Sequence, residues 1–537
     1  PLLVLAGAGS AKTRVITFRL AHLIARGVPP SQILCVTFTN KAAREMRVRA
    51  RALVGKSLRG ATLSTFHALG VRILRRFGDR VGLRPQFTIT DAKDQMGSLR
   101  RILRALKIDD RRFDAKRIQA AISLAKNAGI DPGEFRELDG VLPGADAEAL
   151  LSDDEYRLAA MEAYDRYAAD LSAQNVVDFD DLLLHTVRLL RDSDVAHELG
   201  ARWRYAMVDE YQDTNGAQLE LVRRLVSAHG NLCVVGDDDQ SIYGWRGADV
   251  GNILEFERHF PGAKRVTLDV NYRSTQPILD AANAIIANNA KRHDKRLKAA
   301  AGTGEDVVVC AFEDEEKEAE AIAARILALQ GDKMNLGDIA VLYRSNRQSR
   351  AMAMALRWAH IPYRVVGGMD MFDRKELKDA LAYLRVLWNP DDEQSLRRIA
   401  NWPPRGLGAT TLRRVDDWAR DQELSLWEGL TRVDDVPGLG SRASDCVAAF
   451  TDLITRHRKL LPRRKASTVV KKLFDEAGIE GSLMDSSDDG MVAARRVDLV
   501  RDLVKQLEKH EDRWRSAHRG RGGEGDDDDD DDDELAS

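Results

Sequence analysis

The chain has 537 residues, several times the usual length of one domain, so we expect three or four domains. Hydrophobic residues make up 44% and charged residues 31%, which is typical of packed cores under a strongly solvated surface. No run approaches about 18 uncharged apolar residues and no basic-then-apolar leader opens the chain, which argues against transmembrane helices and a secretion signal; we interpret the protein as cytoplasmic.

The net charge of −3 conceals an acidic end, because residues 526–534 carry nine negative charges. Removing them leaves +6, a mildly basic body that is compatible with contacts to a phosphate backbone. The acidic segment and the glycines before it cannot bury apolar surface, so we expect residues 519–537 to form a disordered tail.

The four cysteines are far apart and form no Cys-x-x-Cys pair. This spacing argues against a zinc site, a disulfide framework or an iron–sulfur cluster. We expect Cys35, Cys233, Cys310 and Cys446 to be reduced core residues.

Apolar runs and helical periods alternate from the first residues onward. Residues 2–5 and 33–38 have the pattern of buried strands, and residues 15–25 and 42–54 that of helices, which predicts a parallel sheet with right-handed crossovers. The chain begins without methionine and already inside such a strand, so we expect missing residues upstream.

Helical segments then dominate from about residue 91 to 190, as in an inserted helical domain. Strand patterns return at residues 205–208 and 232–235, where the first sheet is expected to resume. A second α/β segment is expected from Val266, with strands at residues 307–312 and 339–343. Beyond about Gly368 the pattern is helical again, to about Arg515.

The first strand runs into a loop of small residues and then a helix, in the order Leu3-Val4-Leu5-Ala6-Gly7-Ala8-Gly9-Ser10-Ala11-Lys12-Thr13. Backbone N–H groups of such a loop and the positive end of a helix can surround phosphate oxygens. Lys12 would reach the β- and γ-phosphates, and Thr13 would offer a hydroxyl to Mg²⁺. The loop departs from G-x-x-x-x-G-K-[ST] because Ala6 and Ala11 occupy the two fixed glycine positions. If position 11 requires a positive φ, alanine there costs about 1–2 kcal/mol.

The strand at residues 205–208 ends in two acids, Asp209 and Glu210. In a parallel sheet these acids emerge at the edge where the phosphate loop lies. Asp209 could then hold Mg²⁺ through water, and Glu210 could orient and deprotonate the attacking water. An isolated Asp-Glu pair is more often a capped strand end, but its combination with Lys12 and Thr13 favours a triphosphate site.

The string Val208-Asp209-Glu210-Tyr211-Gln212-Asp213-Thr214-Asn215 resembles motif II of the UvrD/Rep/PcrA helicases of superfamily 1. Asp178-Phe179-Asp180-Asp181-Leu182, which ends the helical insertion, also fits. Within the family, Gly236-Asp237-Asp238-Asp239-Gln240 points toward Rep. Further segments resemble other motifs in the family's order: Val36-Thr37-Phe38-Thr39-Asn40-Lys41-Ala42-Ala43, Ser64-Thr65-Phe66-His67, Val235-Gly236-Asp237-Asp238-Asp239-Gln240-Ser241-Ile242-Tyr243-Gly244-Trp245-Arg246-Gly247-Ala248, Asn271-Tyr272-Arg273-Ser274-Thr275 and Ile339-Ala340-Val341-Leu342-Tyr343-Arg344-Ser345-Asn346.

The resemblance implies an α/β fold with RecA-like (P-loop NTPase) parallel-sheet motor domains and inserted all-helical subdomains. It implies ATP and Mg²⁺ bound between the motor domains and DNA across their top. The expected division is motor domain 1A at residues 1–90 and 191–265, insertion 1B at 91–190, an incomplete motor domain 2A at 266–367, an incomplete insertion 2B at 368–518 and the tail at 519–537.

The resemblance also implies roles for single residues. Glu210, Gln240, Arg273 and Lys12 would be catalytic, with Gln240 reporting the γ-phosphate and Arg273 acting as an arginine finger. Thr13 and Asp209 would hold the metal. Nucleotide-binding residues would be Ala6, Gly7, Ala8, Gly9, Ser10, Ala11, Lys12, Thr13, Arg14, Tyr272 and Arg273. DNA-binding residues would be Thr37, Phe38, Asn40, His67, Tyr243, Trp245, Arg246 and Asn346, with the aromatic rings stacking on bases.

Several of these residues have a simpler interpretation. Phe38 and Trp245 could be core aromatics, His67 a core histidine with its hydrogen bonds satisfied, and Arg273 a surface ion-pair partner. The ordered set of motifs favours the functional interpretation.

The implied function is an ATP-dependent 3′-to-5′ DNA helicase acting on single-stranded, forked or 3′-tailed DNA in replication or repair, without membrane partners, as a monomer or weak dimer. A glutamine segment that contacts adenine is expected upstream of Pro1, and motifs V and VI beyond Ser537, so we interpret the chain as truncated at both ends. Two alternatives remain: a catalytically weak, nucleotide-responsive DNA-binding fragment, and the motor part of a helicase–nuclease of the AddA/RecB type.

Overall fold

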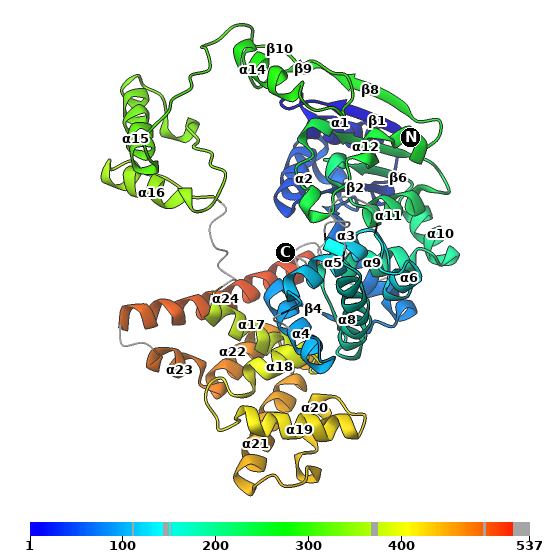
Figure 1. Cartoon of the computed structure of the whole chain (residues 1–537), viewed down its shortest axis with the longest axis vertical. Helices are drawn as coiled ribbons and strands as arrows, with labels where there is room; N and C mark the ends of the chain where they lie inside the picture. The colour runs from blue at the N-terminus through cyan, green and yellow to red at the C-terminus, as the bar shows by residue number, and fades with distance from the viewer. Residues whose placement is uncertain (110–111, 143–149, 152, 367–373, 487–489, 519–537) are drawn as a thin grey trace. The chain divides into compact units, whose positions relative to one another are not determined.

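A computed structural model describes residues 1–109, 112–142, 150–151, 153–366, 374–486 and 490–518 (Figure 1). These residues fall into two compact units. The first combines Pro1–Gly304 with Asp379–Ser537, and the second is Glu305–Lys378. No helix in the described part of the chain is long and apolar enough to cross a membrane. The expected tail, residues 519–537, lies outside the described residues.

The first unit is built on a six-stranded sheet with strand order β3-β2-β6-β7-β1-β8, as far as the described residues show. All of its neighbouring strands run parallel. The strands are β1 Leu2–Ala6, β2 Ile33–Thr37, β3 Thr62–Thr65, β6 Tyr205–Val208, β7 Leu232–Gly236 and β8 Lys264–Leu268. The predicted parallel sheet is therefore confirmed, and β6 has the predicted bounds.

Alternate residues of each buried strand face opposite sides of the sheet, as the twofold strand period requires. In β1, Leu3 and Leu5 join one core, and Val4 and Ala6 join another. The first core is completed by helices α3 (Phe66–Phe77), α9 (Phe179–Leu189), α10 (Ser193–Arg202) and α11 (Gly216–Val226), and the second by α1 (Lys12–Ala25) and α2 (Asn40–Val54). Both faces of the sheet are thus covered by helices, which is the arrangement of a parallel α/β fold.

The helices that cover this sheet begin directly after its strands or after the helical insertion. They are α1 Lys12–Ala25, α2 Asn40–Val54, α3 Phe66–Phe77, α9 Phe179–Leu189, α10 Ser193–Arg202 and α11 Gly216–Val226, followed by the short α12 Gly251–Leu254 and α13 Phe256–His259. Side chains cap several of them: Thr39 accepts from the Ala42 N–H and Thr65 from the Ala68 N–H. Such caps satisfy N–H groups that the first turn of a helix leaves free.

Because the strands are parallel, the loops that follow them gather at one edge of the sheet. Ala6, Thr37, Val208 and Gly236 are the last residues of β1, β2, β6 and β7. The carboxyl ends of parallel strands are where α/β proteins bind their ligands. The fold therefore brings the loops that carry the predicted motifs to the same edge.

The helical insertion packs around a core of its own and a buried ion cluster. Its elements are α4 Ala92–Ala105, α5 Ala115–Asn127, α6 Pro132–Glu137 and α8 Asp154–Ala173, with the two-stranded pair β4 Thr88–Ile89 and β5 Val176–Val177. Lys126 is 1% exposed, and its Nζ lies 2.7 Å from Asp178 and 2.6 Å from Asp181. Removing one partner of such a buried pair typically costs about 3–5 kcal/mol, so this cluster fixes α5 against the start of α9.

The later part of the first unit is helical, as predicted. Its helices are α17 Lys375–Trp388, α18 Glu393–Ala400, α19 Ala409–Asp421, α20 Leu426–Thr431, α21 Ser441–Arg458, α22 Ala466–Ala477, α23 Ile479–Asp485 and α24 Gly490–His518. The Asn389 side chain donates to the carbonyl oxygens of Gln174 and Asn175, and Arg101 pairs with Glu393. These bonds join α17 and α18 to the first helical insertion.

Two segments expected to be strands are not strands. Residues 307–312 and 339–343 pair with no other segment in the described part of the chain, and Val308, Val309 and Leu342 are 80%, 92% and 94% exposed. A strand is defined by its ladder partners, and an apolar run without them stays extended but unpaired. The second unit is held instead by α15 Glu315–Gly331 packed on α16 Gln348–Trp358.

Two further expectations need correction. Val266 does not begin a second sheet, because β8 pairs with β1 and completes the first one. The remaining elements before the second unit are β9 Val270–Asn271, α14 Gln276–Ile286 and β10 Lys298–Ala299, where β9 and β10 form a separate parallel pair. Cys310 is exposed and Cys446 partly exposed, so only Cys35 and Cys233 are buried; all four are free.

Candidate nucleotide and DNA site

The loop between β1 and α1 is tightly curled. The backbone N–H and the side-chain hydroxyl of Ser10 both donate to the Gly7 carbonyl, at 3.2 and 2.7 Å. Gly9 has a φ of 71°, and a Cβ there would lie 2.5 Å from the Asn271 amide nitrogen. Glycine is thus required at position 9 both by its backbone angle and by the neighbouring chain.

Ala11, the N-cap of α1, adopts a left-handed conformation with φ 69° and ψ 38°. This is the conformation that makes glycine favourable at the second fixed position of the phosphate-loop pattern. An alanine methyl costs about 1–2 kcal/mol there. The loop therefore keeps its curled shape while storing local strain.

Lys12 and the acids after β6 lie together, as the sequence predicts. Lys12 Nζ is 3.2 Å from Glu210 Oε2. The Thr13 side chain lies close enough to the Asp209 carboxylate to oppose the rise of its pKa, and the Asp209 N–H donates to the Val36 carbonyl at 2.8 Å. Two segments about 200 residues apart in the chain thus form one polar cluster at the carboxyl edge of the sheet.

In this cluster the carboxylates of Asp209, Glu210 and Asp213 outnumber the single ammonium of Lys12. Burial, reinforced by the neighbouring Glu210, raises the pKa of Asp209 to about 6 and that of Asp213 to about 7. Lys12 Nζ is buried and makes no hydrogen bond with a described residue. Buried carboxylate and hydroxyl oxygens of this kind are the ligands that Mg²⁺ prefers, so the residues fit a magnesium-bound phosphate.

Gln240 belongs to the same edge, in the short helix η5 Asp238–Gln240 after β7. Its side-chain amide donates to Asp237 at 2.5 Å. Gln212 connects this loop to the acids: its Oε1 accepts from the Asp237 N–H at 2.9 Å, and its Nε2 donates to Glu210 at 3.0 Å. Gln240 and Glu210 are therefore joined through Asp237 and Gln212.

The segment after β8 contacts the phosphate loop directly. The Tyr272 N–H donates to the Gly9 carbonyl at 2.9 Å, and the Asn271 side chain donates to the Ala8 carbonyl at 2.5 Å. The Tyr272 side chain is 68% exposed, and the Arg273 guanidinium pairs with no described residue. The alternative that Arg273 is an ion-pair partner thus has no support in the described structure.

Aromatic side chains form a row next to Gln240. Phe38 stacks on Tyr243 with ring centroids 5.1 Å apart, and Tyr243 lies 6.4 Å from Trp245. The Arg246 guanidinium lies over both the Tyr243 and Trp245 rings. Trp245 is 73% exposed, so the alternative that it is a core aromatic is wrong. Partly exposed rings that lead to an exposed tryptophan beside an arginine are suited to bases and a phosphate backbone.

The other predicted DNA residues occupy neighbouring loop positions. Thr37 ends β2, and its buried hydroxyl has no partner among the described residues. Asn40 opens α2 and is exposed. His67, in the first turn of α3, is half-buried and packs edge-on against Phe179; burial lowers its pKa, opposed by Asp180.

The last two predicted residues, Arg14 and Asn346, are both exposed. Arg14 lies on the exposed side of α1, with its guanidinium over the Phe18 ring. Asn346 is in the second unit, in the exposed loop before α16, where its carbonyl accepts from Ser349.

The sequence interpretation missed Gln212, Asn271 and Lys295. Lys295 is 3% exposed and contacts all three consecutive acids after β7. The sequence does indicate that a cation is needed there, because three adjacent carboxylates at the end of a buried strand require nearby positive charge. The sequence does not say which of its 82 lysines and arginines supplies them.

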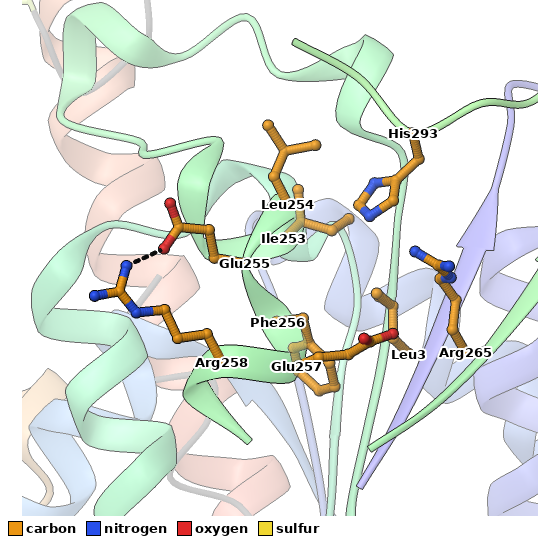
Figure 2. Close-up of a pocket in the computed structure, with 9 residues that line it drawn as sticks. All are labelled: Leu3, Ile253, Leu254, Glu255, Phe256, Glu257, Arg258, Arg265 and His293. Carbon is orange, nitrogen blue, oxygen red and sulfur yellow. Dashed lines mark hydrogen bonds and ion pairs between the residues drawn. The ribbon is translucent and has the colours of Figure 1, made fainter. Parts of the chain in front are cut away.

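A cavity of about 320 Å³ is lined by Leu3, Arg265 and His293 and by residues of α12 and α13, and contains none of the predicted nucleotide residues. Figure 2 shows His293 and Arg265 on one side of it and the Glu255–Arg258 ion pair on the other. Within the described ranges, no group of three or more histidine, cysteine or acidic residues is arranged to hold a metal ion by itself.

Comparisons with known proteins identify relatives over nearly the whole chain. Residues 1–261 match the family model "UvrD/REP helicase N-terminal domain", and residues 266–433 match "UvrD-like helicase C-terminal domain". The ATP-dependent DNA helicase PcrA of Leuconostoc citreum is 39% identical over 96% of this chain and 67% of its own length. The protein of the same name from Bacillus subtilis (strain 168) is 39% identical over 96% and 68%, and that from Staphylococcus aureus (strain Mu50 / ATCC 700699) is 42% identical over 89% and 64%. The chain therefore spans about two thirds of the length of these relatives.

Proposed function

The chain belongs to the UvrD/REP helicase family, and from this premise we propose that it is an ATP-dependent DNA helicase that moves along single-stranded DNA. The proposed direction is 3′ to 5′, and the proposed substrates are single strands and forked or 3′-tailed duplexes in replication or repair. A closer relationship to Rep, indicated by the sequence Gly236-Asp237-Asp238-Asp239-Gln240 after β7, stays a prediction, since the relatives named above are PcrA helicases.

The observation that carries the proposal is the meeting of Lys12 with Glu210 beside Thr13 and Asp209. Lys12 would bind the β- and γ-phosphates of ATP, and Thr13 and Asp209 would hold Mg²⁺. Bound there, Mg²⁺ would neutralise phosphate charge. Glu210, displaced from Lys12 by the phosphates, would accept a proton from the attacking water.

Gln240 and Arg273 are proposed to act when the nucleotide arrives. Gln240 would exchange its bond to Asp237 for one to the γ-phosphate. The Arg273 guanidinium has no partner among the described residues, and the Arg273 Cβ lies 2.8 Å from where a Cβ on Gly9 would be, which supports a role as the arginine finger. Tyr272 would stack on the adenine.

Phe38, Tyr243 and Trp245 are proposed to stack on successive bases, with Arg246 on the phosphate backbone. Gln240 of the proposed nucleotide site and Tyr243 of the proposed DNA site are three positions apart in the chain. This short connection supports coupling of the two sites, because a movement of Gln240 would also shift Tyr243. Thr37, Asn40, His67 and Asn346 would contact phosphates or sugars. Stacking is tolerant of sequence, so binding should not depend on base identity.

The domain assignment remains part of the proposal. Residues 1–90 and 191–265 would form motor domain 1A, and 266–367 the second motor domain. The insertions would be 91–190 and 368–518. One sheet with strands from both sides of the helical insertion supports the first assignment.

The test is ATP hydrolysis by the purified chain with Mg²⁺, with and without an oligo(dT) single strand. Wild type should release phosphate faster when DNA is present, and Glu210→Gln should lower kcat at least about 100-fold while ATP still binds. Glu257→Gln, at an exposed acid in α13, is the matched control and should behave as wild type.

A second outcome would favour another function. The strain at Ala11 makes a weakly catalytic, nucleotide-responsive DNA-binding protein the specific alternative. Nucleotide-dependent DNA binding without phosphate release, in wild type as in Glu210→Gln, would contradict the helicase proposal and support that alternative. Unwinding of a 3′-tailed but not a 5′-tailed duplex would establish the direction.

A further inference from the structure

Three consecutive carboxylates, Asp237, Asp238 and Asp239, follow β7 at the centre of the site. Asp237 and Asp238 are 2% and 6% exposed. Adjacent buried carboxylates repel one another and lose their hydration, so they need nearby cations to stay ionised.

One short segment between α14 and β10 supplies these cations. Lys295 Nζ lies 3.0 Å from Asp237, 2.8 Å from Asp239 and in contact with Asp238. Arg292 makes two bonds of 2.9 Å to the Asp239 carboxylate. We call this group of five side chains the acid clamp.

The segment also offers backbone and apolar contacts. The His293 N–H donates to Asp238 at 2.7 Å, while the His293 ring lines the cavity of Figure 2. The side chain of Leu297 lies where a Cβ on Gly7 would be, against the phosphate loop. Residues 292–297 therefore touch the phosphate loop and the acids beside Gln240 together.

The clamp stays charged at neutral pH. Burial acts to raise the pKa of Asp238, but hydrogen bonds from His293 and Lys295 hold it well below its usual range. Burial acts to lower the pKa of Lys295, and Asp237 with the other acids raises it above its usual value. Both ions are thus kept in the charged form by each other.

The clamp is connected to the groups proposed to act on ATP. Asp237 accepts from Gln240, and its N–H donates to Gln212, which donates to Glu210. A shift of Asp237 would therefore move both the γ-phosphate sensor and the proton acceptor, although Lys295 itself touches neither.

We propose that Lys295, assisted by Arg292, is a positioning residue for ATP turnover: it fixes Asp237 and thereby sets the places of Gln240 and Glu210. The inference deepens the proposed function and rests on it. The ion pairs of Lys295 are with Asp237, Asp238 and Asp239 and not with the described residues of the phosphate loop, so it should affect the rate of hydrolysis rather than the binding of ATP.

The experiment compares steady-state ATP hydrolysis on oligo(dT) for wild type, Lys295→Met and Lys295→Arg in the full chain. Lys295→Met keeps most of the apolar stem and removes the charge. It should lower kcat by about tenfold or more and leave the KM for ATP within about threefold, and Lys295→Arg should recover much of the loss because it restores the charge. Lys317→Met, at an exposed lysine paired with Glu320, is the matched control and should change neither constant.

A purely structural role predicts a different pattern. Equal loss of kcat in Lys295→Met and Lys295→Arg, together with a lower thermal midpoint, would overturn the proposal, as would wild-type kcat in Lys295→Met. If Lys295→Met does not fold, Arg292→Gln decides: a lower kcat at unchanged KM supports the clamp, and an unchanged kcat overturns it.

Different results would overturn the proposed helicase function and the positioning role of Lys295. Absence of DNA-stimulated hydrolysis in wild type itself would overturn the proposed function, and this inference with it. Normal wild-type hydrolysis with an indifferent Lys295→Met variant would overturn this inference alone.

Discussion

Ala11 shows how one methyl group can strain a site without removing it. Its left-handed backbone angles are set by the turn from β1 into α1, and glycine would adopt them without steric cost. The surrounding bonds, from Ser10 to Gly7 and from Lys12 to Glu210, hold the turn despite the strain.

Ala11→Gly should therefore raise the thermal midpoint and increase the affinity for ATP. The gain in folding free energy should be below about 1 kcal/mol, because glycine also gains freedom in the unfolded chain. Ala52→Gly, at an exposed position within α2, is the control and should lower stability by about 0.5–1 kcal/mol. Thermal unfolding and titration with a fluorescent ATP analogue measure both effects. A lower midpoint for Ala11→Gly would show that the positive φ carries no strain.

At this scale the sequence predicts residues whose role is local and misses those whose role depends on packing. The pairing of Lys12 with Glu210 follows from two short patterns and the rule that parallel strands share an edge. Lys295 has no such pattern, because its partners lie 56 to 58 positions away and only the folded loop brings them together.

Helix α9 carries the clearest pH-sensitive group among the elements. Burial, with help from Lys126 and Arg188, lowers the pKa of His185 from 6.5 to about 4. Its Nδ1 is buried without a partner among the described residues. The unfolded chain therefore binds the proton more readily than the folded one, and stability falls as the pH drops below 6.5.

Lowering the pH from 8 to 5 should cost about 2 kcal/mol through this histidine alone. His185→Gln removes the titrating group, so its thermal midpoint should fall less than that of wild type over the same pH range. His197→Gln, at an exposed histidine in α10, is the control and should follow wild type. Parallel decreases for wild type and His185→Gln would mean that His185 is protonated in the folded protein.

Elements with a strong apolar period are predicted well, and those defined by their neighbours are not. β1, β2, β6 and β7 are buried on both faces and read as apolar runs. β3 is buried but consists of Thr62, Leu63, Ser64 and Thr65, so it lacks the apolar run by which the other buried strands are recognised in the sequence. β8 is largely exposed and joins the first sheet only because β1 offers it an edge.

At the scale of the whole molecule, one strand, β7, leads into both the proposed nucleotide site and the proposed DNA site. Gln240 lies four residues after the end of β7, and Trp245 five residues later. A parallel sheet thus brings the proposed phosphate sensor and the aromatic row proposed to bind bases onto one short loop, next to the acids that follow β6.

Trp245→Ala should weaken single-strand binding by about 1–3 kcal/mol and leave DNA-independent ATP binding unchanged. Trp358→Ala is the control, since Trp358 is similarly exposed, at 71%, in the second unit. Fluorescence anisotropy of labelled oligo(dT) measures the affinities. Equal losses in both variants would argue that general surface hydrophobicity, rather than the row with Phe38 and Tyr243, binds DNA.

The central claim is that Lys12, Thr13, Asp209 and Glu210 surround one triphosphate. A crystal structure of the chain with Mg²⁺ and a non-hydrolysable ATP analogue tests it most directly. The account predicts phosphate oxygens bonded to Lys12, the metal beside Thr13 and Asp209, and Gln240 turned from Asp237 to the γ-phosphate. A nucleotide bound elsewhere, or phosphates that touch Lys12 while the metal is remote from Asp209, would contradict it.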